Sequence, residues 1–589
     1  MISSTQPPLL RRLIWIIPTL AALVSLVWLS SHLAALRIFQ VDECQNLYMA
    51  RILARGLASE FFTNASLFLL GPLSWITSGA TSSVQCFETA RLLFLGVFWL
   101  NLALIAVIAS GKLYSPRTLF ALVAAATLAP LWDYGFEIRH DNLVLTGVLL
   151  TWWTVRTRPM GAASYCLAGA VAVATLFVAV KAVVYVVPLS FAVLAFPPPA
   201  FKLPRWRLAL SWAAGAALAT AAIRIGYGNG GGWEIYLSVF HGVARYSTGG
   251  GGGGPGFAPW LALSRLLTQT PLLLALVTAA GAATVGHALH RGFRAPGWNG
   301  LFPEFLLFAG CLAALAINPT PYPYNLVHVV PYAFILSFRY VDSLGAEIWG
   351  RAQLRPVLIG VLVFAHLTPF AVATQRHLSR LNWRQERLMS LAEDLTDPAN
   401  DRVYDGIGMV PTRLSIHSNW YLHGLNIQSF LDGSVCRVSE MLSARPPSVF
   451  IPSYRTDWLA ESDHDFVTNH YVPLADDFWV LGKVLGQGGG TFEITHGGRY
   501  RISTLKGSDL NNTYELGVKG AVTPEDPGTL SGVLDGQPIC NLPVELTVGT
   551  HRLECSTNCQ PAVVWVGPHL DRIHRIGPGD HRALFVNWY

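Results

Sequence analysis

Charged residues are scarce in this chain. Of its 589 residues, 13% are Asp, Glu, Lys or Arg and 52% are hydrophobic, whereas soluble domains carry about 25% charged residues. The mean hydropathy is +0.41. This shortage excludes an ordinary soluble domain and predicts an integral membrane protein embedded in a lipid bilayer.

Several catalytic and binding motifs are also absent. The sequence has no P-loop, no HExxH of a zinc protease and no glycine fingerprint for a flavin or nicotinamide cofactor. Its apolar segments hold few of the paired charges that a proton-coupled carrier needs. A transporter is therefore disfavoured.

What the chain does contain is a series of charge-free runs. They predict transmembrane helices, because about 20 apolar residues span a bilayer core. The Pro-rich stretch NPTPYPYN divides the run 305–338 in two, which gives about eleven spans. The long runs are 13–36, 92–111, 159–180, 182–201, 266–290, 305–338 and 356–375, and the shorter ones are 118–132, 142–155 and 208–223.

Basic residues between these runs set the orientation, because cytoplasmic loops collect Lys and Arg. The basic loops alternate with loops that hold the acids and the length, so the N-terminus is expected inside and the chain after about residue 375 outside. The net charge of +6 is largely this signal and predicts no nucleic-acid partner. The basic residues are Arg11, Arg12, Lys112, Arg117, Arg156, Arg158, Lys202, Arg205, Arg207, Arg291, Arg294, Arg351 and Arg355.

Eight cysteines divide between the two environments. Cys166 and Cys311 lie in predicted spans, and six lie on the predicted outer side, where disulfides form. Cys44 with Cys86 could close the first outer loop, and Cys540 with Cys555 or Cys559 could close the C-terminal region. A zinc site at CSTNC is the weaker interpretation, since a second thiol pair is lacking.

The polar C-terminal third predicts a folded outer region. Residues 376–395 have the pattern of an amphipathic helix, and 401–405, 447–453 and 477–485 the pattern of short strands, which together predict an α/β part over 376–486. Residues 487–589 alternate with period two and contain an Asp-Gly turn at 535–536, which predicts a β-sandwich with a hairpin there. A carbohydrate-binding module and a lid or spacer are equally compatible with that part.

Charges at the ends of apolar runs are the candidate functional residues, because they are costly near a membrane. Asp42 and Glu43 follow the first run and point about 100° apart on a helix, so one of them is expected to face a given pocket. The residues after them place Cys44 and Tyr48 on one face, which suggests an amphipathic helix on the membrane surface.

Three further groups lie at the ends of later runs. EIRHDN gathers Arg139, His140 and Asp141 before a span, and a solvated turn is the alternative. Lys181 stands alone between two apolar runs, where binding a phosphate and snorkelling to the interface are equally compatible. The stretch 319–332 contains Tyr322, Tyr324, Asn325 and His328, and anchoring in the aromatic belt explains the tyrosines.

One outer loop, 226–258, carries His241 and Arg245 ahead of six consecutive glycines at 249–254. Such a run is flexible. It could let the preceding helix close over a site, and a plain linker is the alternative interpretation.

The order of these motifs resembles that of the GT-C superfamily of membrane glycosyltransferases, specifically the protein mannosyltransferase and lipid A aminoarabinose transferase type. The matching features are VDE after the first span, R-x-D in EIRHDNLVL, a lysine in VKAVVYVVP and the stretch PYPYNLVHVVPY. The resemblance covers residues 10–375. The chain departs from it at His140, where the family pattern has proline, and at Ala182, where it has glycine.

The resemblance implies an α-helical polytopic membrane protein with an outer C-terminal region, located in the inner (plasma) membrane. It implies an inverting transferase that moves a sugar from a polyprenyl-phosphate donor to a glycolipid, polysaccharide or protein acceptor. A lipid-linked sugar flippase and an O-antigen-type polymerase with a lipid-diphosphate donor are the alternatives.

The resemblance also implies roles for individual residues. Asp42 would be the catalytic base and Glu43 a helper or a surface residue. Arg139 and Lys181, with His140, would stabilise the donor phosphate, and Asp141 would orient Arg139 or bind the sugar. No ligand spacing demands a metal, but some relatives use one, so a divalent metal near Asp42 and Glu43 is compatible with the resemblance.

Overall fold

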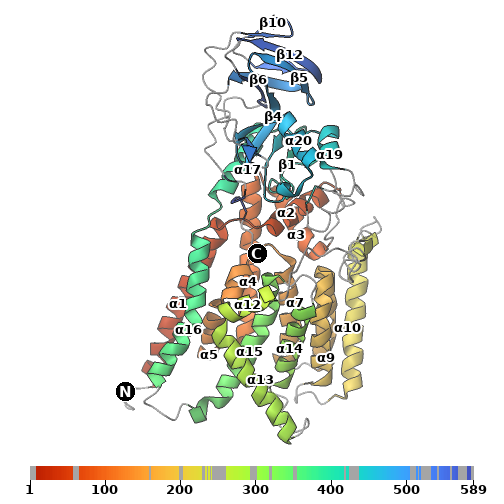
Figure 1. Ribbon diagram of the computed structural model, residues 1–589. Coiled ribbons are helices and arrows are strands. Elements are labelled where there is room, and N and C mark those ends of the chain that lie inside the picture. The colour runs from red at the N-terminus through yellow and green to blue at the C-terminus, as the bar shows by residue number, and fades with distance from the viewer. Residues whose placement is uncertain are drawn as a thin grey trace. The chain divides into compact units, whose positions relative to one another are not determined.

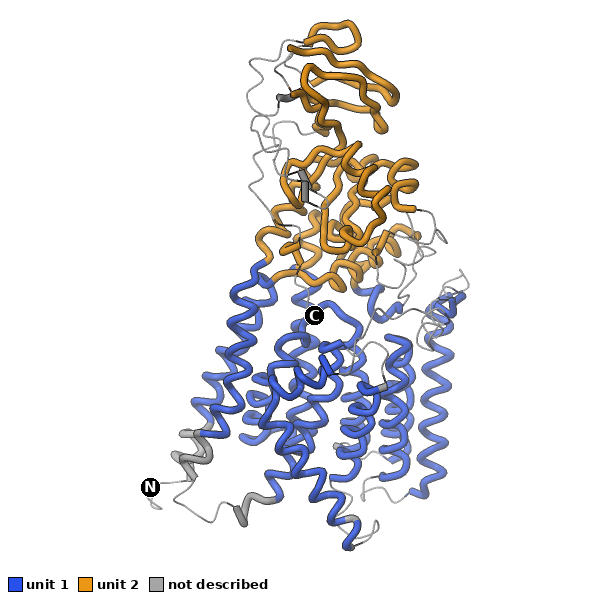
Figure 2. Tube along the Cα trace, viewed as in Figure 1, with its two compact units in different colours: residues 1–37, 61–72, 88–381 blue, residues 38–60, 73–87, 382–589 orange. Residues whose placement is uncertain are grey.

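The chain forms two compact units, which we describe separately. Unit 1 comprises residues 1–37, 61–72 and 88–381, and unit 2 comprises residues 38–60, 73–87 and 382–589 (Figure 2). The predicted first outer loop, 37–90, is thus shared between them. The computed structural model describes residues 8–57, 66–157, 161–197, 203–228, 233–234, 236–238, 241, 260–291, 301–317, 322–348, 355–416, 420–422, 437–504, 513–514, 517–518, 532–539, 543–556, 560–567, 580 and 582–585.

Unit 1 is helical, with its helices running alongside one another (Figure 1). Each predicted apolar run lies on at least one described helix, and the run 305–338 is divided in two as predicted. The elements are α1 (Pro8–Leu36), α5 (Pro116–Ala126), α6 (Ala129–Tyr134), α7 (His140–Thr157), α8 (Ala162–Val178), η2 (Val180–Ala182), α9 (Val183–Ala195), α10 (Arg205–Gly226), α12 (Trp260–Gln269), α13 (Pro271–Arg291), α14 (Phe302–Ile317), η5 (Pro323–Asn325), α15 (Leu326–Ile348) and α16 (Arg355–Leu378). Two further helices, α3 (Leu67–Gly79) and α4 (Ser83–Ser110), have residues in both units.

Length and apolar composition identify membrane-crossing helices within the described residues. Three are long and apolar enough, namely Ile16–Leu36 of α1, α4 and α10, and the bent pair α12–α13 could make a fourth. The other apolar helices are shorter. The predicted count of about eleven spans therefore stays a prediction.

Small residues let the helices that carry the candidate site approach closely. A Cβ atom at Gly147 of α7 would lie 2.0 Å from the Thr175 hydroxyl of α8, and one at Gly310 of α14 would lie 2.7 Å from Pro188 of α9. Such close approach is typical of helix packing in membranes, where small residues replace a hydrophobic driving force. These contacts pack α7 closely against α8 and α9 closely against α14 within unit 1.

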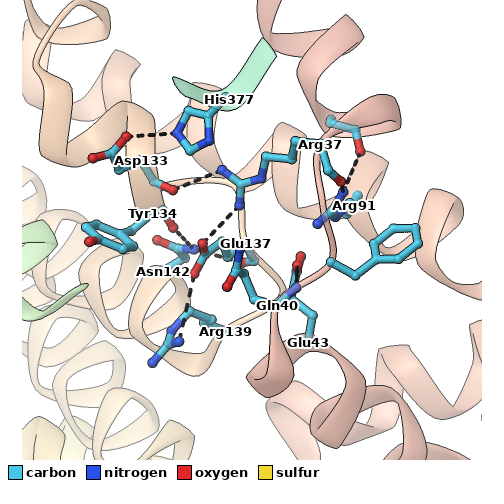
Figure 3. Close-up of polar contacts among 12 residues, drawn as sticks. Arg37, Gln40, Glu43, Arg91, Asp133, Tyr134, Glu137, Arg139, Asn142 and His377 are labelled. Atoms are coloured by element: carbon cyan, nitrogen blue, oxygen red, sulfur yellow. Dashed lines mark hydrogen bonds and ion pairs between the residues drawn. The ribbon is translucent and has the colours of Figure 1, made fainter. Parts of the chain in front are cut away.

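A buried polar network ties the end of α1 to α6 and to the start of α7 (Figure 3). The Arg37 guanidinium forms a 3.1 Å ion pair with Glu137 and donates a 2.9 Å hydrogen bond to the Asp133 carbonyl. Both charged side chains are 1% exposed. The Asp133 carboxylate in turn pairs with His377 of α16 at 2.8 Å. The sequence signals did not single out Arg37, Asp133 or His377.

Unit 2 is built on a seven-stranded sheet and a four-stranded sheet. The first has the order β1-β2-β4-β13-β6-β11, with β3 also paired to β4, and the second has the order β10-β9-β12-β5. The strands β1 and β2 pair in parallel, and most other pairs are antiparallel. The strands are β1 (Val403–Tyr404), β2 (Val449–Phe450), β3 (Tyr471–Ala475), β4 (Phe478–Val484), β5 (Gly489–Ile494), β6 (Gly498–Thr504), β7 (Thr513–Tyr514), β8 (Gly517–Val518), β9 (Gly532–Leu534), β10 (Gln537–Pro538), β11 (Val544–Leu546), β12 (Gly549–Cys555) and β13 (Pro561–Trp565).

Several C-terminal predictions can be compared with these strands. The hairpin at Asp535–Gly536 is confirmed, since β9 and β10 pair around it and both residues have positive φ. The pairing of β13 with β4 carries one sheet across the predicted domain boundary at 486. The predicted helix 376–395 is wrong as a single element, because α16 ends at Leu378 and α17 (Trp383–Leu395) begins afresh.

The helix that follows the first span belongs to unit 2 and is buried. Along α2 (Val41–Ala54), ten of the fourteen residues are buried, so the prediction of an amphipathic helix on the membrane surface is wrong. Tyr48 packs against Trp420 with the ring centroids 4.2 Å apart, and its hydroxyl accepts a hydrogen bond from the Ser415 amide at 2.6 Å. A Cβ atom at Gly408 would lie 2.7 Å from Tyr48. These contacts come from residues more than 350 positions later, which no local pattern reveals.

The remaining helical elements of unit 2 are α19 (Val438–Ala444), η6 (Thr456–Trp458) and α20 (Glu461–His470). Cys44 and Cys86 are buried thiols, so the predicted disulfide between them is not formed. Cys555 also carries a thiol and not a disulfide, while Cys540 and Cys559 lie outside the described residues.

The Arg37–Glu137 pair gives a stability prediction for unit 1. Replacing Arg37 by Gln removes the nearer of the two cations paired with the buried Glu137 and leaves Arg139 at 3.8 Å; breaking a buried pair typically costs about 3–5 kcal/mol. We expect a correspondingly lower free energy of unfolding, measured by denaturation of the purified full chain in detergent. The double variant Arg37→Gln/Glu137→Gln should recover part of the loss.

An exposed ion pair of the same unit supplies the control. Arg117 and Asp342 pair at 2.9 Å with side chains 62% and 45% exposed. Arg117→Gln should change the free energy of unfolding by less than about 1 kcal/mol. Equal losses in Arg37→Gln and Arg117→Gln would contradict the importance given to the buried pair.

Candidate functional site

The segment EIRHDN forms a hydrogen-bonded turn that leads into α7. The Asn142 side-chain amide donates to the carbonyls of Tyr134 (3.0 Å) and Glu137 (2.9 Å), and the Asn142 carbonyl accepts from Asn101 of α4 at 3.1 Å. Asn142 is 1% exposed. The turn is therefore fixed from both sides, and this fixes where the side chains of Arg139, His140 and Asp141 begin.

Asp141 is the centre of a cluster of basic groups in unit 1. Its Oδ1 lies 2.5 Å from Lys181 Nζ and 3.4 Å from His328 Nε2, and its Oδ2 lies 3.3 Å from Arg139 Nε and 3.7 Å from His140 Nε2. The Asp141 side chain is 2% exposed. One buried carboxylate thus holds two permanent cations and two imidazoles.

Tyr324 provides an aromatic face for both cations. The Arg139 guanidinium carbon lies 3.6 Å from the ring centroid and Lys181 Nζ lies 4.9 Å from it. The ring quadrupole attracts a cation over its face. Tyr322 stacks on Tyr324 at 5.4 Å, and the Asn325 amide donates to the Tyr322 carbonyl at 3.1 Å.

His328, at the start of α15, is fixed by a second aromatic ring. It stacks on Tyr185 of α9 with ring centroids 4.1 Å apart and is 1% exposed. Tyr185 is a residue that the sequence reasoning missed. Its position four residues after Lys181, one helical turn on, was the available signal.

The structure therefore brings together residues that the sequence offered as three separate groups. Arg139, His140 and Asp141 come from the start of α7, Lys181 from η2, and Tyr324 and His328 from η5 and α15. The side chains of Lys181 and His140 are 27% and 26% exposed, whereas that of Arg139 is 8% exposed. Lys181 and His140 are therefore the more accessible members of the cluster.

Asp42 lies in unit 2, in the first turn of α2. A helix N-terminus favours a carboxylate there. Asp42 also interacts electrostatically with Arg455, Tyr421 and Tyr454. Burial alone would lower the pKa of Arg455, but the two tyrosine hydroxyls and the Asp42 carboxylate outweigh it and raise that pKa.

Arg455 is a second residue that sequence reasoning missed. Its Nε donates to the Tyr454 hydroxyl at 3.0 Å and its Nη1 to the Leu422 carbonyl at 2.8 Å, and its guanidinium lies 4.7 Å from the Trp458 ring centroid. The residue is 8% exposed. Its position after β2 gave no signal of a connection to Asp42, more than 400 residues earlier.

Glu43 has a structural role in unit 2. Its Oε2 accepts a hydrogen bond from the backbone N–H of Gln40 at 2.8 Å and so caps α2. Glu43 is 0% exposed, so the alternative of a surface residue is wrong.

The remaining predictions concern His241, Arg245 and a divalent metal. His241 is exposed, and Arg245 lies outside the described residues. Among the described residues, no group of three or more His, Cys, Asp or Glu side chains could hold a metal ion. One oxygen of Glu43 caps α2, and we derive no step through a metal.

Comparisons with known proteins give structural likenesses alone, since no protein-family model and no curated protein matches the chain. One similar structure is an oligosaccharyltransferase of Archaeoglobus fulgidus tethered to an acceptor peptide, at 12% identity over 77% of this chain and 72% of that one, with a TM-score of 0.44. Another is ArnT of Cupriavidus metallidurans bound to undecaprenyl phosphate, at 15% identity over 80% of this chain and 98% of that one, with a TM-score of 0.46. Both neighbours are GT-C superfamily glycosyltransferases. At these TM-scores the likenesses carry no functional conclusion, and the proposal below comes from the chain's own residues.

Proposed function

We propose that this protein is an inverting membrane glycosyltransferase that moves a sugar from a polyprenyl-phosphate donor to a hydroxyl of a cell-envelope acceptor. The observation that carries the proposal is the pair of cations, Arg139 and Lys181, held over Tyr324 at the ends of apolar helices in unit 1. Paired cations at the end of apolar helices suit a ligand with an anionic head and a hydrocarbon tail. A polyprenyl phosphate has that composition.

The proposed role of the cations is to stabilise the leaving phosphate. When the bond between the anomeric carbon and the phosphate oxygen breaks, the oxygen keeps the electron pair, and the phosphate gains negative charge. Charged donors fixed in a water-poor setting stabilise such developing charge strongly. We assign this role to Lys181 and Arg139, with His140 as a further donor.

The proposed base is Asp42. A hydroxyl is a poor nucleophile, so a carboxylate must take its proton as the new bond to the anomeric carbon forms. Attack from the face opposite the phosphate inverts that carbon. The assignment rests on the resemblance of VDE to the GT-C motif and on the position of Asp42 in unit 2, in the first turn of α2 and in electrostatic interaction with Arg455.

The proposed location is the inner (plasma) membrane, with the acceptor on the outer face. Three helices long and apolar enough to cross a bilayer support a membrane protein. The side of the membrane follows from the basic loops of the sequence alone. A lipid-linked sugar flippase would use the same cations without Asp42, so the experiments below separate the two functions.

The first prediction concerns the base. Asp42→Asn should lower sugar transfer by about 10²–10⁴-fold, the usual contribution of a positioned base, with donor binding retained. The assay is transfer from a labelled polyprenyl-phosphate sugar by the purified full chain in nanodiscs with an envelope extract as acceptor. Asp465→Asn, at an exposed residue of the same unit, is the control. Transfer at the wild-type rate in Asp42→Asn would sink the base assignment, and translocation of donor without cleavage would favour a flippase.

The second prediction concerns the anion site. Lys181→Gln should weaken donor binding by about 10- to 100-fold, because a hydrogen bond to a charged group contributes about 1.5–3 kcal/mol. Titration of the purified protein with farnesyl phosphate, a short-chain analogue of the carrier, measures the loss. The exposed Lys112 provides the matched control, Lys112→Gln. If both variants bind as the wild type does, the cluster is not the phosphate site.

A further inference from the structure

Asp141 occupies the position that a bound anion needs. The Asp141 carboxylate pairs with Lys181 Nζ at 2.5 Å and with Arg139 Nε at 3.3 Å. Both are donors that the proposed function assigns to the phosphate. A carboxylate and a phosphate accept hydrogen bonds from the same charged donors at similar distances. The site therefore contains its own competing anion.

The two anions must also lie close together when both are present. A phosphate oxygen held by Lys181 at about 2.8 Å can be no more than about 5.3 Å from Asp141 Oδ1, given the 2.5 Å from that oxygen to Nζ. Like charges at such a distance repel strongly where solvent screening is weak. Asp141 is 2% exposed, so water screens it poorly.

The Tyr324 ring positions the two cations without changing the net charge of the cluster. Its ring holds Arg139 at 3.6 Å and Lys181 at 4.9 Å without adding a negative charge. The cations thus have a support that does not depend on Asp141 alone. The distinct contribution of Asp141 is its charge.

The chemistry of the reaction makes that charge useful. The donor is a phosphodiester with a single negative charge, and the product is a phosphomonoester, whose second ionisation near pH 6 gives it almost two charges at neutral pH. A purely cationic site would hold the product more tightly than the donor and would trap it. A fixed carboxylate opposes the product more than the donor, because repulsion grows with the charge.

We propose that Asp141 is a counter-charge that lowers the affinity of this site for the released polyprenyl monophosphate relative to the sugar-bearing donor. This inference rests on the proposed function, because it assumes a phosphate at Arg139 and Lys181. It makes Asp141 a determinant of donor-over-product selectivity. A residue that merely braced the two cations would raise the affinity for both ligands alike.

The test compares a matched pair of probes, farnesyl phosphate as the monoester and farnesyl methyl phosphate as the diester. Binding of each is measured at pH 8 to the full chain in detergent, for the wild type and for Asp141→Asn. We expect the variant to bind the monoester more tightly, with a gain at least about tenfold larger than its gain for the diester. Asp342→Asn, at an exposed carboxylate of unit 1, should leave the ratio of the two affinities unchanged.

Three other results have distinct meanings. If Asp141→Asn weakens both probes or changes both equally, Asp141 is a brace and the inference is wrong, while the phosphate site stands. If the wild type binds neither probe, the proposed function itself fails. If Asp141→Asn does not fold, the wild type alone decides, because a counter-charged site should prefer the monoester by no more than about threefold and a purely cationic site by about tenfold or more.

Discussion

Every charge buried in unit 1 has to be compensated, and this constraint shapes the unit more than any other. An isolated charge costs several kcal/mol away from water, whereas a paired and hydrogen-bonded one is tolerated. The described part of unit 1 contains three such groups. They centre on Asp141, on Asp133 with His377, and on Glu304, which pairs with Arg156 at 3.5 Å and with Arg339.

These groups fix helices at both ends. On α7, Asp141 stands in the first turn and Arg156 in the last, and each belongs to a different group. On α15, His328 near the start contacts Asp141, and Arg339, eleven residues later, contacts Glu304. Two helices joined in this way cannot slide past each other without separating buried charges. The arrangement of Arg139, Lys181 and His328 is therefore determined by the whole helix pair.

How much of this the sequence could predict depends on the range of the interaction. The apolar runs, the break before α15 and the Asp-Gly hairpin are local patterns, and the structure confirms them. Arg139, Asp141, Lys181 and His328 could be nominated one by one, because each charge or imidazole interrupts an apolar context. Their meeting around one carboxylate spans 187 positions from Asp141 to His328, and periodicity says nothing at that range.

The failures have the same physical origin. A helix is predicted to be amphipathic when its apolar residues recur every three to four positions. Whether its other face is also buried depends on the rest of the chain, and α2 is buried because Trp420, Ser415 and Gly408 surround Tyr48. The expected disulfide assumed that Cys44 and Cys86 face one another in an outer loop, whereas both are buried thiols. Arg37 was passed over because a basic residue after an apolar run looks like a loop charge. Its role depends on Glu137, one hundred positions away.

Tyr324, the two cations and Asp141 contribute in different ways to the binding of an anion, and the same distinction applies to other anion sites in apolar proteins. A site that must bind and then release a charged lipid cannot simply accumulate cations. The electrostatic attraction that raises the affinity for the lipid also opposes its release. Here an aromatic ring contributes position, two cations contribute attraction, and a carboxylate sets how much of that attraction is left for a ligand. Because the ring and the carboxylate act on the same two cations by different physics, the affinity of the site can be adjusted at Asp141 without rebuilding its geometry.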